Sequence, residues 1–217
     1  MKRTALRTAL LLSLALLWAA SAGAEEVVRS FRQQIPAGEI EKISLDFPVG
    51  EVTVEAWDGS QVDLDVKLAC NHSITHRCAD AAKAVRLVYD NSGDRLRVEV
   101  KNWPRFDTRG LHVLAHISVP RDIPLHAELG VGEMNVRGTA SDLNVGVGVG
   151  EVNITLPKEA IHTVDLDTGV GEANLVAAGR RYESAGLIAR ELRWDKGTGR
   201  AGVTVDCGVG EIDVTLR

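Results

Sequence analysis

One short pattern occurs five times in this chain of 217 residues, and it constrains the fold more than any other feature. The copies read FPVGEVTVEAW, LGVGEMNVRG, VGVGEVNITL, TGVGEANLV and CGVGEIDVTL, and they begin at Phe47, Leu129, Val147, Thr168 and Cys207. Each contains Val-Gly-Glu followed by alternating apolar and polar residues. Such self-similarity is typical of folds that stack one small unit repeatedly. The candidate turn residues are Gly50, Glu51, Gly132, Glu133, Gly150, Glu151, Gly171, Glu172, Gly210 and Glu211.

The apolar phase changes across each Gly-Glu pair. In the first copy the apolar residues occupy odd positions up to Val49 and even positions from Val52. The same change occurs at Val131/Met134, Val149/Val152, Val170/Ala173 and Val209/Ile212. Strand side chains alternate with period two, so a two-residue turn at Gly-Glu would keep one face of the chain directed inward. The pattern therefore predicts that these valines belong to the inward face.

Two structures satisfy this parity. One is a type II′ hairpin, which needs glycine at its first central position. The other is the corner of a β-solenoid coil of about 20 residues. In either case the second glycine of each copy is expected to have a positive φ. Pro48 replaces the first glycine in one copy, which indicates that this position requires little side-chain bulk more than unusual dihedrals.

The segments between the copies also favour strands. Gln61–Leu68 alternates, Leu87–Val100 is typical of a hairpin around a Ser-Gly turn, and Leu111–Pro120 is predicted to be a strand ended by proline. A short helix is expected near residues 75–86, where Cys78, Ala81, Ala82 and Val85 have helical spacing. A degenerate copy is expected near Leu187–Trp194. We therefore predict an all-β, β-solenoid-like stack of short strands with Gly-Glu corners and one helix.

Residues 1–24 have the layout of a secretory signal peptide cleaved after Ala24, with a basic start, an apolar run and a small-residue end. The alternative is a retained anchor helix. Glu25, not cysteine, follows the predicted cut, which argues against a lipoprotein. Residues 25–217 are then expected to form a single domain in the periplasm or beyond, without a transmembrane segment. Removing three cations takes the net charge from −5 to −8, which argues against nucleic-acid binding.

The sequence contains no convincing cofactor or catalytic motif. Gly146, Gly148 and Gly150 lack the spacing of a dinucleotide loop, and a strand pattern follows them. His112 and His116 would lie about 13 Å apart on one strand face, too far to share a metal, and His126 and His162 stand alone. Asp165 and Asp167 share a strand face and are the candidates for a carboxylate pair in a glycan-cleaving enzyme. We expect no cofactor and no enzymatic activity.

The cysteines indicate an exported protein. Cys70 and Cys78 bracket CNHSITHRC and favour a disulfide that joins a strand end to the helix. A metal site with His72 and His76 is an alternative, and so are free thiols. Cys207 occupies a small-residue position of its repeat and is expected in a packed wall.

Two charged features suggest contacts. Stacked coils would align Glu133, Glu151 and Glu172 at about 4.8 Å, either as a solvated edge or as a calcium site. Gly179–Arg200 is the one basic and aromatic segment, and it either contacts a polyanion, glycan or protein or covers the degenerate coil.

The stretches GEIEKISLDFPVGEVTVEAWDGSQVDLDV and ISVPRDIPLHAELGVGEMNVRG resemble the bacterial envelope β-strand-repeat family known as putative adhesins, a domain of unknown function. Members usually have Gly-Asp where this chain has Gly-Glu. The resemblance implies a solenoid-like fold and an envelope address. The expected protein is an exported binding, adhesin-like or envelope-stress-related scaffold. Its partner would be an unknown envelope protein or glycan, and self-association is possible. The alternative is a periplasmic enzyme acting on envelope glycans.

Overall fold

The computed structural model describes residues 25–71, 75–104, 110–184 and 190–217, so the predicted signal peptide lies outside the described part. The described residues form an all-β protein with one short α-helix. The elements are β1 (Glu26–Pro36), β2 (Lys42–Trp57), β3 (Gln61–Cys70), α1 (Thr75–Ala82), β4 (Arg86–Ser92), β5 (Arg95–Lys101), β6 (Leu111–Pro120), β7 (Leu125–Arg137), β8 (Leu143–Leu156), a 3-10 turn (Lys158–Ala160), β9 (Ile161–Ala177), β10 (Arg180–Glu183), β11 (Arg190–Trp194) and β12 (Ala201–Leu216). The expected all-β class is confirmed.

The five copies of the repeated pattern lie on the five longest strands, which are neighbours in the order β2-β7-β8-β12-β9. Each strand continues through its Gly-Glu pair and is parallel to its neighbours before and after it. A hairpin would instead pair the two halves of one strand with each other. The hairpin interpretation of Gly-Glu is therefore wrong, and the pair marks a bend within a strand.

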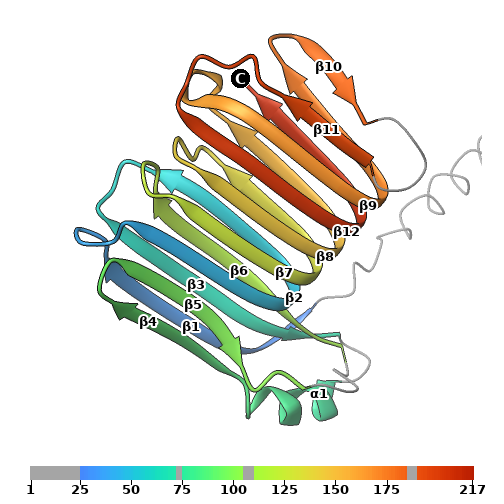
Figure 1. Ribbon diagram of the computed structural model, residues 1–217. Coiled ribbons are helices and arrows are strands. Elements are labelled where there is room, and N and C mark those ends of the chain that lie inside the picture. Colours follow the sequence, from blue (N-terminus) through green and yellow to red (C-terminus); the bar gives the residue numbers. More distant parts are fainter. Residues whose placement is uncertain (1–24, 72–74, 105–109, 185–189) are drawn as a thin grey trace, which may run out of the picture.

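The bends divide each long strand into two limbs, and the limbs form two layers (Figure 1). The first limb of β2 pairs with β5, and the first limb of β9 pairs with β11. The second limb of β2 pairs with β6, and the second limb of β9 pairs with β10. Parallel strands β5 and β6 thus extend the stack at the β2 end, and antiparallel strands β10 and β11 extend it at the β9 end. The structure establishes an open, mixed twelve-stranded sheet, while the solenoid-like description stays a prediction.

The core lies between the two limbs and is filled by the residues that alternate inward from both of them. One transverse row of this core is contributed by the residue three positions before each corner glycine. It consists of Phe47, Leu129, Val147, Cys207 and Thr168, all at most 3% exposed. Cys207 is therefore a small residue in a packed wall, as expected, and burial raises the pKa of its thiol.

The helix and the disulfide close one end of the molecule. Cys70 at the end of β3 is bonded to Cys78 in α1, so the predicted disulfide is confirmed and the alternative metal site loses both thiolates. His72 and the side chain of His76 lie outside the described residues. The helix ends at Ala82, before the expected residue 86. Bonds from N–H groups to carbonyls three residues earlier tighten the turn after it.

Most of the other predicted strands are present. The strand from Gln61, the hairpin of β4 with β5 and the strand ended by Pro120 are confirmed. The degenerate copy near Leu187–Trp194 is not a corner strand in its described part, because β11 is a short strand antiparallel to β9. No α-helix in the described residues is long and apolar enough to cross a membrane.

Candidate functional site

The corner glutamates form a row along the bends. Register pairing places them in the order Glu51, Glu133, Glu151, Glu211, Glu172, with neighbours about 4.8 Å apart as in any sheet. We call this the glutamate row. The expected direct neighbourhood of Glu151 and Glu172 is wrong, because the C-terminal strand β12 inserts between β8 and β9 and contributes Glu211 between them.

The corner glycines have the predicted backbone conformation. Gly50, Gly132, Gly150, Gly171 and Gly210 have φ values between 137° and 150°, a region that side-chain-bearing residues rarely adopt. They also face each other across strands, so that a Cβ at Gly150 would collide with the carbonyl oxygen of Gly132. Both the dihedral angle and the strand contact therefore require glycine.

The first glycine of each copy has a separate reason. A Cβ at Gly148 would lie 2.5 Å from the carbonyl oxygen of Gly130, which agrees with the expected close approach. Pro48 occupies the same position on β2, the last of the corner strands on this side. Its ring is accommodated because the next strand, β6, pairs with β2 only from Gly50 onward. Gly146, which the repeat does not explain, lies where a Cβ would collide with the carboxylate of Glu128.

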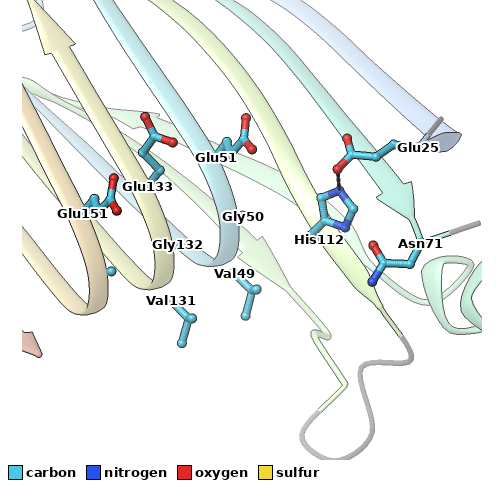
Figure 2. A pocket seen from close by; sticks show the side chains of 11 residues that line it. Glu25, Val49, Gly50, Glu51, Asn71, His112, Val131, Gly132, Glu133 and Glu151 are labelled. Atoms are coloured by element: carbon cyan, nitrogen blue, oxygen red, sulfur yellow. Dashed lines mark ion pairs between the residues drawn. The ribbon is translucent and has the colours of Figure 1, made fainter. Parts of the chain in front are cut away.

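The valines before the corner glycines are exposed, which corrects the prediction that they face inward. Val131, Val149, Val209 and Val170 are 45–51% exposed, and half-buried Val49 continues their row. We call these five residues the valine ridge. The parity change is spread over four residues, since Leu129 and Met134 are the flanking inward side chains and the positive-φ glycine reverses the chain between them. Figure 2 shows Val49 and Val131 on the opposite side of the bends from the glutamates.

A groove of about 460 Å³ follows the corners of β2, β7 and β8 (Figure 2). Val49, Val131, Glu51, Glu133 and Glu151 line it, together with their glycines, and Glu25, Asn71 and His112 close one end. His112 Nε2 lies 3.1 Å from a carboxylate oxygen of Glu25, and its Nδ1 lies 3.0 Å from the carbonyl oxygen of Gly110. The groove is thus an acidic and apolar hollow with one imidazole at its end.

Negative charge along the glutamate row is only partly compensated within the described residues. At the β9 end, Arg190 Nη1 lies 3.6 Å from Glu172. Nearer the middle, repulsion from Asp213 raises the pKa of Glu211, with smaller contributions from burial, a hydrogen bond to Asp213, and the charges of Glu172 and Glu151. A raised carboxyl pKa means that this part of the row would be stabilised by an added positive charge.

A second acidic row runs on the other side of the valine ridge, three residues before each valine. Its register order is Asp46, Glu128, Gly146, Asp206, Asp167, and we call it the first-limb row. Burial, followed by repulsion from Asp167 and Asp165, raises the pKa of Asp206. His126 Nε2 lies 3.2 Å from Glu128. The valine ridge is therefore framed by carboxylates on both sides.

The candidate carboxylate pair for glycan cleavage does not form a free pair. Asp165 and Asp167 lie two residues apart on β9, and Arg193 Nη2 of β11 lies 2.8 Å from Asp165. That pairing raises the pKa of Arg193. Asp165 is therefore engaged in an ion pair across two strands and is not free to contact a substrate together with Asp167.

The other sequence candidates are dispersed. His116 lies 3.7 Å from Glu55, and Nδ1 of His162 lies 3.1 Å from the carbonyl oxygen of Gly197. Among the described residues, no group of three or more His, Cys, Asp or Glu side chains is placed to hold a metal ion. In the basic segment, Lys196 lies over the ring of Tyr182 at 5.8 Å and Trp194 is buried, so several of its side chains serve internal packing.

Sequence reasoning missed the valine ridge and the first-limb row. The sequence contained a usable signal. A glycine with positive φ directly follows each of these valines and interrupts the period-two alternation of side chains at the corner. An acidic residue also recurs three positions before four of the corner valines. These acids are Asp46, Glu128, Asp206 and Asp167.

The bent parallel strands and the open two-layer sheet define the class of protein, an all-β fold built from repeated bent strands. A crystal structure named as a putative cell adhesion protein from Clostridium sporogenes is 16% identical, with a TM-score of 0.51, over 87% of this chain and 99% of that chain. A putative adhesin from Bacteroides fragilis is 10% identical, with a TM-score of 0.29, over 86% of this chain and 97% of that chain. No family model and no curated protein match the sequence. The first similarity shows a shared fold.

Proposed function

We propose that this chain is an exported, non-enzymatic binding protein of the bacterial envelope, with an adhesin-like role carried by a single solenoid-like domain of residues 25–217. Cleavage after Ala24 would release this domain. The disulfide between Cys70 and Cys78 supports an oxidising compartment. The fold shared with a solved structure named for cell adhesion supports binding over chemistry.

The observation that carries the proposal is the valine ridge. Four valines in successive register positions are about half exposed on a rigid scaffold. Contiguous exposed apolar surface that is rimmed by polar residues marks interaction sites on proteins. Five aligned corners present the same side chains repeatedly, which suits recognition of an elongated partner.

Binding is favoured over the glycan-cleaving alternative by the ion pair between Asp165 and Arg193. Inverting and retaining glycosidases both need one carboxyl group that can be protonated. Asp165 is instead occupied by its ion pair with Arg193, and the valines of the ridge carry no group that could replace it.

The test is site-specific photocrosslinking of the full chain expressed with its own leader. The leader is expected to be removed, leaving Glu25 as the first residue by mass spectrometry of the exported fraction. A photoreactive residue at Val149 should crosslink to envelope material, while the same residue at Val88, an exposed valine of β4, should not. A chain that stays in the cytoplasm, or one that crosslinks equally from both positions, would overturn the proposal.

A further inference from the structure

We infer that the valine ridge and its two acidic rows bind a cationic amphipathic helix, a polypeptide segment with an apolar stripe flanked on both sides by lysine or arginine. This inference rests on the proposed binding function and names its partner class. It concerns the convex ridge together with the groove beside Val49 and Val131.

The repeat distances favour a helix. Five valines at about 4.8 Å intervals span about 19 Å. An α-helix of about 13 residues has the same length, and its turns repeat every 5.4 Å, close to the strand interval. An extended chain repeats its side chains on one face only every ~6.6 Å, so it would soon fall out of step with the valines.

The charge pattern favours cations on both flanks of that helix. Each glutamate of the glutamate row lies two residues after a ridge valine, and each acid of the first-limb row lies three residues before one. Crowding of like charges raises the pKa of Glu211 in one row and contributes to the raised pKa of Asp206 in the other. Lysine and arginine can lay their methylene stems along the valines and carry their charges to these carboxylates.

A second copy of the same surface is a poorer partner. If two valine ridges faced each other, the glutamate row of one copy would lie against either the glutamate row or the first-limb row of the other. Both of these rows are acidic. Because like charges across an interface oppose association, the surface selects a partner of opposite charge.

The test is a fluorescence anisotropy titration of the exported chain with two labelled leucine–lysine peptides of about 14 residues. One places leucine at helical spacing, and the other has the same composition in strict alternation. Only the helical peptide is expected to bind with measurable affinity. Its affinity should fall as ionic strength rises. Equal affinity for both peptides, or no binding of the helical one, overturns the inference.

Variants locate the site. Val131→Ser/Val149→Ser/Val209→Ser removes the apolar stripe, and Glu133→Gln/Glu151→Gln/Glu211→Gln removes charge while preserving shape. Each is expected to weaken binding by about tenfold or more. Matched controls away from the corners, Val27→Ser/Val88→Ser and Glu39→Gln/Glu41→Gln/Glu159→Gln, should leave binding within about twofold. Corner variants that bind like their controls overturn the inference.

Crosslinking of the helical peptide from a photoreactive residue at Val149, but not from Val88, provides a measurement that does not depend on the stability of the triple variants. If Val149 crosslinks to envelope material but never to the peptide, the partner class is wrong and the proposed function stands. Capture of a glycan at Val149 would likewise overturn the partner class and leave the proposed function standing. If the chain is not exported, the proposed function itself fails.

Discussion

The carbonyl oxygen of Gly132 occupies the place where a side chain at Gly150 would begin. This contact joins neighbouring parallel corners, and it recurs from Gly50 to Gly171 along the stack. Gly150→Ala combines this collision with φ 147°, so we expect a loss of more than about 2 kcal/mol in the free energy of unfolding. Urea denaturation followed by circular dichroism measures it.

The control for that substitution is Gly93→Ala. Gly93 has φ 70° but open space around the position of a Cβ. Only the backbone penalty applies there, about 1–2 kcal/mol. An equal loss for the two variants would show that the stacked corners do not require a bare backbone.

The disulfide should stabilise the fold by limiting the unfolded chain. For the short loop closed by Cys70 and Cys78, the loss of chain entropy corresponds to about 2.5 kcal/mol. Reduction should therefore lower the urea midpoint. The shift should persist in Cys207→Ala, since Cys207 is a free buried thiol. A shift that disappears in Cys207→Ala would place the redox effect at that residue.

Arg29 links β1 to the end of the helix. Its Nη1 donates to the carbonyl oxygens of Ala82 at 2.9 Å and Val85 at 2.7 Å, and its guanidinium lies 4.8 Å from the centre of the Phe31 ring. Arg29→Met leaves those carbonyls without their cationic donor and should cost about 1–2 kcal/mol.

Hydrogen exchange provides the local measurement of this link. Amides of residues 78–85 should exchange faster in Arg29→Met than in the parent. Arg32→Met is the matched control, because Arg32 lies on the same strand as Arg29, is exposed, and pairs with Asp65 of β3 at 3.4 Å. It should change stability by less than about 0.5 kcal/mol. Faster exchange in the control variant as well would contradict the specific role of Arg29.

Glu211 should make stability depend on pH in a defined direction. Its pKa is raised in the folded state, chiefly by Asp213, so its ionised form disfavours the fold at pH values above that raised pKa. The penalty fades as pH falls through the raised pKa towards the ordinary glutamate value. Glu211→Gln should therefore be slightly more stable than the parent near neutral pH and should lose this advantage in acid.

The size of this effect is limited by solvent screening, because Glu211 is exposed. A gain of a few tenths of a kcal/mol is expected at low ionic strength, and added salt should reduce it. Thermal unfolding of Glu211→Gln and of the surface control Glu159→Gln over a pH series measures it. A gain that grows as pH falls would contradict the assigned sign.

Much of the secondary structure could be predicted from local patterns. Alternation identified β3, the β4–β5 hairpin and β6, and helical spacing identified α1. The positive φ at the corner glycines also followed from the residue type. The exposure of Val131 could not be predicted from the same patterns. Side chains alternate between the two faces of a strand only while the backbone stays extended. Gly132, with φ 137°, interrupts this alternation.

The sequence by itself determined that this chain consists of strands with repeated glycine bends, because side-chain periodicity and glycine conformation are local properties. Only the tertiary structure decided which bends are neighbours. Glu211 lies between Glu151 and Glu172 because β12 pairs with both β8 and β9, two strands that precede it in the chain. All five strands carry nearly the same pattern, so no local signal distinguishes their partners. Packing of the whole stack selected the order, and with it the valine ridge and its acidic frame.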